Sequence, residues 1–261
     1  MSLLCAAASL PLFAPAPQAA THAIDAMTAW AAWVDEVVRG PLDIAQPGLG
    51  NATYGAEAYV LGPAAGDFLT VLSLGDGGHL TVEFEDPIVD GPGDDFAVFE
   101  NGFIDNGSGE LFGEIAFVEV SSNGVDFARL GTLTTNTSAV SSGGTIDPAD
   151  YAGFAGVDVA GYGTGFDLAE LIGHPLESQG LLDLQDVGFV RVVDAIGDGS
   201  TFDDSMNPVY DPYATIFASG GFDLDGVGAL NVPEPGATGL LGAGLTALSL
   251  LARRHARRRR R

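Results

Sequence analysis

The sequence predicts an all-β protein, a β-sandwich or jelly roll, with one N-terminal helix before it and a C-terminal transmembrane helix after it. Short runs rich in Val, Ile and Phe recur through the middle of the chain, and turns rich in Gly and Asp separate them. Many short strands joined by such turns are typical of two packed antiparallel sheets. Residues 24–232 are numerous enough to bury one large core, so we expect a single domain there.

Residues 1–23 are predicted to be a secretory signal peptide. They are almost free of charge, and the segment from Leu3 to Leu12 is apolar. Small residues at the −3 and −1 positions predict cleavage after Ala23, and Ala14-Pro15-Ala16 offers the same pattern upstream. The alternative is an Ala- and Pro-rich terminus without a targeting role, because no Lys or Arg precedes the apolar run.

Residues 24–38 show the strongest helical pattern in the chain. Apolar residues recur there three and four positions apart, and Gly40-Pro41 ends the pattern. We therefore expect one helix that packs against the body. Trp30 and Trp33 are expected to lie in the core rather than to form a carbohydrate platform. The repeating apolar residues are Ile24, Met27, Trp30, Val34 and Val37.

Beyond this segment the hydrophobic pattern changes to the two-residue period of strands. Asn123-Gly124 is expected to close a tight hairpin, because both residues adopt the left-handed conformation that such turns require. Residues 132–145 are rich in Ser, Thr and Gly and predict a surface loop, and residues 166–171 predict one helical turn. The expected strands are 69–74, 80–84, 96–99, 115–120 and 189–193.

The charge of the chain is strongly acidic, with 35 Asp and Glu residues against 10 basic ones. Every basic residue is an arginine, and all but Arg39, Arg129 and Arg191 lie at 253–261. Nucleic-acid binding needs a basic face, and phosphate-binding loops of the Walker type need a lysine, so both functions are excluded. An acidic body suits divalent cations, high salt or simple solubility.

Nucleophilic and thiol chemistry are poorly supported. Cys5 is the sole cysteine and lies in the predicted signal peptide, so no internal disulfide or cysteine zinc site is expected. The body contains no G-x-S-x-G motif, and His79 and His174 are expected to lie in turns or at strand ends. We assign no catalytic residue and expect no enzyme. An acidic-pair glycoside hydrolase stays an alternative, since so many carboxylates form pairs by chance.

Calcium is the sharper hypothesis for a cofactor. Residues 90–101, 194–204 and 221–226 concentrate carboxylate and amide oxygens in Gly-rich loops, and Ca²⁺ prefers such ligands. A strand of roughly 17 Å divides the first segment, so we expect separate sites that fix loops and do no chemistry. The alternative is that these residues form turns and their charges are solvated. The predicted ligands are Asp94, Asp95, Glu100, Asn101, Asp194, Asp198, Asp203, Asp223 and Asp225.

Glycan binding would need exposed aromatic rings beside polar groups. Tyr210 and Tyr213 flank an Asp-Pro pair in a predicted loop and form the best candidate patch. Packing of that loop onto the sandwich explains the two tyrosines equally well.

The C-terminal segment 233–261 has three parts. Pro233-Glu234-Pro235 is followed by a 16-residue apolar run at 237–252, and then by an arginine cluster that begins with Arg253 and Arg254. The run is slightly shorter than the roughly 20 residues that span a bilayer comfortably, and helix tilt or snorkelling arginines can cover the difference. By the positive-inside rule the arginines lie in the cytoplasm, which places the body outside.

This order of motifs resembles the PEP-CTERM sorting signal of exported bacterial proteins. The resemblance implies that the inner membrane holds the protein until an exosortase-type enzyme cleaves it near Pro233-Glu234-Pro235. The protein would then be released or attached at the cell surface, in association with exopolysaccharide. The alternative is an ordinary C-terminal anchor.

The body is also similar to secreted jelly-roll domains of bacterial cell surfaces. Gly91–Asn101, Glu114–Gly124 and Gly221–Val227 carry this likeness, and Val118–Phe127 resembles a discoidin-like strand pair. The resemblance implies a non-enzymatic surface or extracellular-matrix protein. A carbohydrate-binding module is the first alternative, and aromatic rings that line one concave face would favour it.

Overall fold

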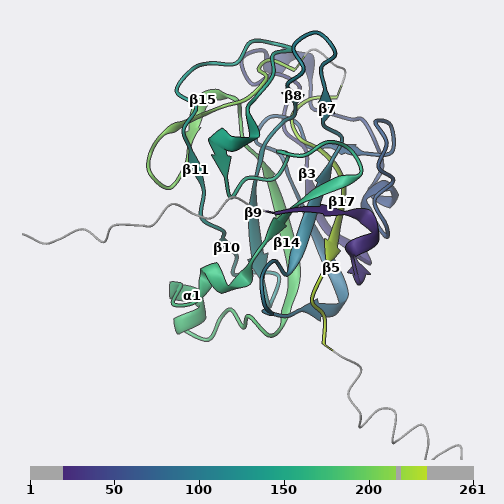
Figure 1. Ribbon diagram of the computed structural model, residues 1–261, viewed down its shortest axis with the longest axis vertical. Coiled ribbons are helices and arrows are strands. Elements are labelled where there is room, and N and C mark those ends of the chain that lie inside the picture. Colours follow the sequence, from purple (N-terminus) through teal and green to yellow (C-terminus); the bar gives the residue numbers. More distant parts are fainter. Residues whose placement is uncertain (1–19, 216–218, 234–261) are drawn as a thin grey trace, which may run out of the picture.

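The computed structural model describes residues 20–215 and 219–233 and shows two antiparallel sheets packed face to face (Figure 1). The all-β sandwich expected from the sequence is confirmed. Most of the predicted signal peptide and the apolar run at 237–252 lie outside the described residues. Among the described residues, no helix has the length and apolar character required to cross a bilayer.

The first sheet has the order β1-β13-β6-β17-β2, and β4 also pairs with β17. The last of these strands along the chain, β17, therefore lies between β6 and β2. The bounds are β1 Thr21–Ala23, β2 Ala29–Trp30, β4 Leu72–Ser73, β6 Phe96–Glu100, β13 Tyr162–Phe166 and β17 Asp223–Ala229.

The second sheet has the order β10-β9-β14-β5-β3. Its bounds are β3 Trp33–Val38, β5 His79–Ile88, β9 Ala116–Ser121, β10 Ala128–Arg129 and β14 Val187–Asp194. Three short ribbons complete the β-structure: β7 Phe103–Ile104 with β8 Leu111–Phe112, β11 Leu133–Thr134 with β12 Tyr151–Ala152, and β15 Asp198–Phe202 with β16 Pro208–Tyr210.

Helical structure among the described residues is limited to single turns. The helix α1 spans Pro175–Ser178, and His174 caps it by accepting a hydrogen bond from the backbone N–H of Leu176. The turn expected at 166–171 is present as a 3₁₀ helix over Leu168–Leu171. The other 3₁₀ turns are Ile24–Ala26, Pro47–Leu49, Glu57–Val60 and Pro148–Asp150.

The core lies between the two sheets and follows the alternation of the strands. On β5, Leu80 and Val82 point inward, and on β14 Val190 and Val192 do the same. Phe96 from the first sheet closes the core from the other side. Burying a side chain of this size contributes about 1.5–3 kcal/mol, so these alternating positions decide which face of each strand turns inward.

The helix predicted for residues 24–38 is wrong. This segment forms a 3₁₀ turn and the strands β2 and β3, which join the edges of the two sheets. A β-bulge explains the misleading pattern: Val34 pairs with Val82, yet Val37 pairs with Leu80, so one extra residue lies between them. The bulge lets two valines three positions apart face the same core, which imitates the period of a helix.

The tryptophans of this segment differ from each other. Trp30 packs against Phe99 with ring centroids 5.1 Å apart, as expected for a core residue. Trp33 does not lie in the core, because half of its surface is exposed at the edge strand β3.

Most predicted strands are present, namely those within β5, β6, β9 and β14. The strand expected at 69–74 shrinks to Leu72–Ser73, because the chain at Phe68 and Leu69 turns outward into solvent. The tight hairpin at Asn123-Gly124 is instead a longer turn, in which the Asn123 side chain accepts hydrogen bonds from the next backbone N–H groups. The region 132–145 contains strand β11 as well as loop.

Candidate functional site

A cavity of about 630 Å³ opens among the described residues. It lies at the end of the sandwich that carries β7 and β8, at the top of Figure 1. We call it the aromatic pocket. It is lined by Tyr54, Phe68, Leu69, Asn101, Phe103, Ile104, Asn106, Phe112, Glu114, Ser219 and Asp223.

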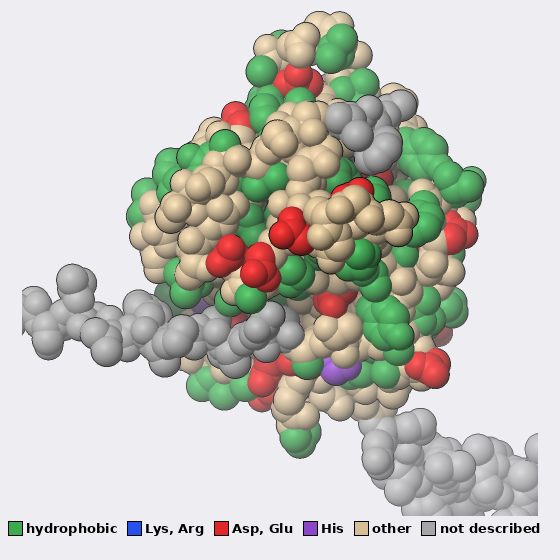
Figure 2. Space-filling view, turned by 45° about the horizontal axis from the view of Figure 1, so that its top comes forward, with side chains coloured by type: hydrophobic (Ala, Val, Ile, Leu, Met, Phe, Trp, Pro, Cys, Tyr) green, Lys and Arg blue, Asp and Glu red, His purple; other side chains and the backbone are tan. Residues whose placement is uncertain are grey.

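Aromatic rings form one wall of the aromatic pocket. Phe103 stacks on Phe112 with ring centroids 5.0 Å apart, and Phe68 meets Phe103 edge-on at 6.0 Å. More than half of the Phe68 surface is exposed, so its ring is available to a ligand. Figure 2 turns this end of the molecule forward and shows hydrophobic side chains with acidic ones among them. Exposed rings around a hollow are unusual on a protein surface and indicate a binding site.

Two aspartates hold the loops that carry these rings. Asp105 accepts hydrogen bonds from the backbone N–H groups of Gly107 and Ser108 and so closes the turn between β7 and β8. These hydrogen bonds lower the pKa of Asp105. Asp67 accepts from the backbone N–H groups of Leu69 and Thr70 in the same way. These polar turns fix the loops, so the loops present apolar side chains to the pocket although their sequences suggest solvated loops.

Two carboxylates line the interior of the aromatic pocket. Glu114 follows β8, and Asp223 begins β17. Both side chains are almost fully buried. Glu114 accepts a hydrogen bond from the Thr215 hydroxyl at 2.5 Å, and Asp223 accepts from Ser73 and from the Asn101 amide. The pocket therefore combines apolar walls with an acidic floor.

Burial raises the pKa of both floor carboxyl groups. For Glu114 the loss of water is the largest cause, and the neighbouring charges of Asp223, Asp211 and Glu100 add to it. The pKa of Asp223 is raised mainly by burial, against hydrogen bonds that lower it. Behind the floor, burial also raises the pKa values of Glu100 and Asp211 far above their usual range. Clusters of this kind hold protons more tightly than isolated carboxyl groups do.

The charge of Arg39 acts on Asp223 and lowers its pKa, against the larger effect of burial. The guanidinium of Arg39 donates its hydrogen bonds to the backbone carbonyls of Tyr54, Gly55 and Ser73. Among residues 20–215 and 219–233, no ion pair reaches Glu114 or Asp223. The two remaining arginines of the body pair with carboxylates of the second sheet, at 2.9 Å for Arg129 and 3.6 Å for Arg191 with Glu119.

Part of the predicted calcium ligand set converges beside the pocket. Glu100 lies opposite Leu224 in the pairing of β6 with β17, so Glu100 and Asn101 come next to Asp223. The acids of residues 90–101 were expected to lie at opposite ends of a strand. The structure agrees, because Asp95 directly precedes β6 and Glu100 ends it. Sequence reasoning missed Glu114 and Asp211, which stand alone in the sequence and become neighbours only in the fold.

Most of the other predicted ligands accept hydrogen bonds from the protein itself. Asp194 accepts from the N–H groups of Gly77 and Phe222, and Asp225 accepts from those of Ala65 and Gly66. Asp203 accepts from the N–H groups of Thr134 and, within its own turn, Ser205. The exposed Asp198 accepts from the N–H of Ser200. Asp94 contacts the Nε2 atom of His22 at 2.7 Å. The contacts within the turns of Asp198 and Asp203 are those of turn-forming aspartates, whereas Asp194, Asp225 and Asp94 join segments far apart in the sequence.

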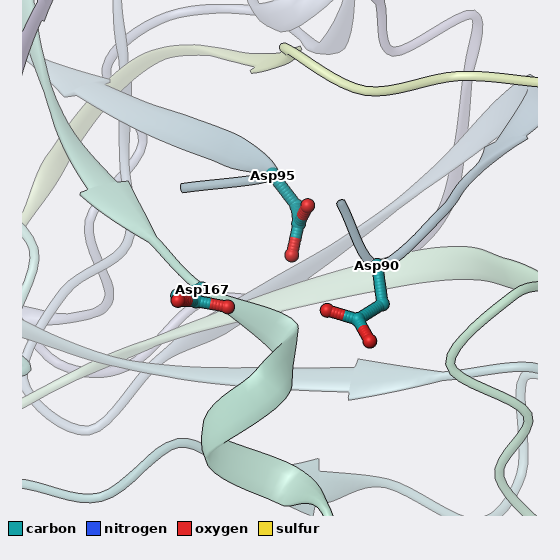
Figure 3. Close-up of side chains that lie close together, drawn as sticks. All are labelled: Asp90, Asp95 and Asp167. Atoms are coloured by element: carbon teal, nitrogen blue, oxygen red, sulfur yellow. The ribbon is translucent and has the colours of Figure 1, made fainter. Parts of the chain in front are cut away.

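One further group of acids has its oxygens close together. Asp90, Asp95 and Asp167 point toward one another, with one oxygen of each within 4.8 Å of the others (Figure 3). A divalent cation could take these oxygens as ligands. Asp95 already accepts hydrogen bonds from Gly91, Leu168 and Asn231, and so ties the C-terminal end of the body to the sheet.

The two tyrosines of the predicted glycan patch are not among the residues that line the aromatic pocket. The Tyr213 hydroxyl donates to Asp43 at 2.7 Å, and the Tyr210 carbonyl accepts from the hydroxyl of Tyr151. Both tyrosines are half-buried. Their contacts are those of a loop packed onto the sandwich.

The comparison with known protein families concerns the C-terminal segment. Residues 231–260 match the PEP-CTERM protein-sorting motif. The chain is therefore an exported protein that is sorted through a C-terminal signal, and the PEP-CTERM motif implies processing by the membrane enzyme exosortase. The motif supports a membrane-anchored precursor that is then delivered to the cell surface. Among curated proteins, none matches the chain.

The match includes the residues predicted for the PEP-CTERM signal. Pro233 is described and lies next to the body, four residues after the end of β17. Glu234, Pro235, Arg253 and Arg254 lie outside the described residues, and so does the predicted inner-membrane helix.

Proposed function

We propose that this chain is a non-enzymatic cell-surface or matrix protein that binds exopolysaccharide through the aromatic pocket. One observation carries the proposal: an aromatic wall and polar floor groups enclose a single hollow of about 630 Å³. This volume falls within the range of sites for small ligands. It suits one or two sugar rings of a longer chain.

The lining of the pocket matches the two chemical faces of a sugar. A pyranose ring presents C–H groups on its flat faces, which pack on aromatic rings such as Phe68 and Phe103. Its hydroxyl groups lie around the rim and need hydrogen-bond partners, which Asn101 and Asp223 supply at the floor. Apolar walls with a few fixed polar groups are the usual design of such sites.

The position of the pocket also supports a role at the surface. The body ends at residues 231–233, which leave at the bottom of Figure 1, while β7 and β8 lie at the top. In a precursor held by its C-terminal segment, the aromatic pocket would face away from the membrane. A ligand outside the cell could then reach it without passing between protein and bilayer.

The experiment that tests this proposal measures binding of the full chain, in detergent, to surface polysaccharide and to defined oligosaccharides. We expect micromolar to millimolar binding, and a loss of about three- to tenfold in affinity for Phe68→Ala, since one aromatic contact contributes about 0.5–1.5 kcal/mol. Phe202→Ala is the matched control, because Phe202 is a similarly exposed ring on β15 outside the pocket. Equal losses in both variants, or no binding to any glycan, would overturn the proposal.

A glycoside hydrolase is the second candidate, because Glu114 and Asp223 line one pocket and both have raised pKa values. Acid catalysis of glycoside cleavage uses a carboxyl group of this kind. The same oligosaccharides, incubated with the full chain, would release new reducing ends if the pocket cleaves them. Glu114→Gln should abolish that release if it is genuine.

A further inference from the structure

We infer that the aromatic pocket selects an amino sugar with a free, positively charged amine over neutral and acidic sugars. The inference rests on the proposed function and names the sugar class. It comes from the contrast between the pocket's acidic floor and the lack of any cation paired with it among the described residues.

Glu114 and Asp223 are the acidic side chains that a ligand in the pocket would contact. Both are buried by more than nine-tenths, so bulk water screens them poorly. An ammonium group in the pocket would gain their attraction together with hydrogen bonds. A sugar carboxylate placed there would face two like charges, neither of which forms an ion pair among the described residues, although the charge of Arg39 acts on Asp223. This arrangement opposes the binding of uronic acids.

The aromatic wall favours the same ligand. A cation within about 6 Å of an aromatic face is attracted by the negative face of the ring. Phe103 and Phe112 stack on each other, and both line the same pocket as Tyr54 and the two carboxylates. An amino sugar offers a C–H face for these rings and an ammonium group for the floor, whereas an N-acetylated sugar offers only the first.

Proton release should accompany the binding of a cation. Burial raises the pKa values of Glu114 and Asp223, so each carboxyl group holds a proton more tightly than an exposed one does. Glu100 and Asp211 lie close by and strengthen this effect, while Arg39 opposes it at Asp223. An arriving ammonium group stabilises the ionised carboxylates, and a proton leaves to solvent.

The test compares glucosamine oligomers, N-acetylglucosamine oligomers and galacturonate oligomers of equal length, titrated into the full chain in detergent at physiological salt. We expect the free-amine oligomers to bind at least tenfold more tightly than the N-acetylated ones, and the acidic oligomers to bind least. Calorimetry in buffers of different ionisation enthalpy should reveal proton release only with the free amine.

Two variants separate the pocket from the acidic surface as a whole. Glu114→Gln removes a floor charge and should lower the amine preference by about tenfold, while Glu85→Gln removes one exposed charge on β5 and should leave it unchanged. Equal effects of both variants would mean that the acidic surface attracts the amine, and the inference would be wrong. Asp223→Asn serves as the second pocket variant if Glu114→Gln does not fold.

The outcomes also distinguish a failure of this inference from a failure of the proposed sugar-binding function. Equal affinity for free-amine and N-acetylated oligomers, both weakened by Phe68→Ala, would overturn the inference and leave the sugar-binding proposal standing. Binding to none of the three classes would overturn both.

Discussion

Buried carboxylates in this protein fall into two groups that differ in their hydrogen-bond partners. Asp95, Asp194 and Asp225 are buried beneath turns, and each accepts hydrogen bonds from at least two backbone N–H groups. Glu114 and Asp223 line the aromatic pocket, and their carboxylates accept hydrogen bonds from side chains: Thr215 for Glu114, and Ser73 and Asn101 for Asp223. The first group holds loops in place, and the second group is available to a ligand or a proton.

Asp95→Ala should be strongly destabilising. The change leaves the buried N–H groups of Gly91 and Leu168 without an acceptor and frees the side chain of Asn231. Each orphaned buried donor costs about 1–3 kcal/mol, so we expect a loss of roughly 3 kcal/mol or more in the free energy of unfolding. Urea denaturation measures it. The exposed Asp86→Ala should change stability by about 0.5 kcal/mol or less, and a similar loss there would contradict the argument.

The stability of the body should fall as pH rises from about 4 to 7. Burial raises the pKa of Asp194 to about 7 and that of Asp76 to about 6. In the unfolded chain both titrate near 4, so within this window the native state binds more protons, and raising the pH disfavours it. We expect a higher Tm at pH 5 than at pH 8 at fixed ionic strength.

Two Asp→Asn variants test which carboxyl group causes this dependence of Tm on pH. Asp194→Asn should flatten the dependence of Tm on pH, while Asp86→Asn should leave it intact, because Asp86 is exposed. A Tm that stays level or rises from pH 5 to pH 8 would contradict this expectation.

At the scale of elements, β3 shows why the hydrophobic spacing of residues 24–38 wrongly predicts a helix. The valines that suggested a helix are brought to one face by a bulge, and a bulge leaves no signature in hydrophobic spacing. The central strands were predictable because regular pairing preserves their two-residue period. Phe96 and Val98 on β6 and Val190 and Val192 on β14 follow that rule.

Deleting Asp35 should be tolerated. Val34 pairs with Val82, Glu36 with Thr81 and Val37 with Leu80, so removing the intervening residue restores a regular ladder without changing the partners. We expect a loss of about 1 kcal/mol or less in the free energy of unfolding. Deleting Val34 instead would place Asp35 against the core and should cost about 3 kcal/mol or more. Equal losses for the two deletions would rule out the bulge.

Strand β1 bears on where the signal peptide ends. Thr21 and His22 pair with β13, and their side chains contact Asp158 and Asp94. Cleavage after Ala23 would remove this strand from the sheet, whereas cleavage after Ala16 would keep it. We therefore predict that the exported protein begins at Pro17, which mass spectrometry of its N-terminus would show. A mature protein that starts at Ile24 would contradict this.

At the scale of the whole molecule, the sorting signal was predictable and the aromatic pocket was not. Pro-Glu-Pro, the apolar run and the arginines are contiguous in sequence, so a linear pattern reveals them. The pocket gathers Tyr54, Phe68, Phe103, Glu114 and Asp223 from loops and strand ends far apart along the chain. Each of these residues alone has the sequence context of an ordinary turn, so only the packing of the two sheets brings them together.

Structural calcium stays a prediction for the body. The test is thermal unfolding of the full chain in detergent with CaCl₂, with MgCl₂ and with excess chelator, at equal ionic strength. An ion bound only to the native state adds about 2.7 kcal/mol at 100 times its Kd, or several degrees of Tm. A rise specific to calcium would support sites such as that at Asp90 and Asp167. Identical curves would leave these acids as turn formers.

The place of β17 in the first sheet links folding to secretion. It is the last strand to emerge, yet it lies between β6 and β2 and pairs with both. A chain that crosses the membrane from its N-terminus thus lacks the middle of one sheet until residue 229 has passed. The first sheet cannot be completed before β17 is present, because β17 pairs with both β6 and β2. The sorting motif at 231–260 follows directly after this strand, so the segment that completes the body adjoins the segment that sorts it.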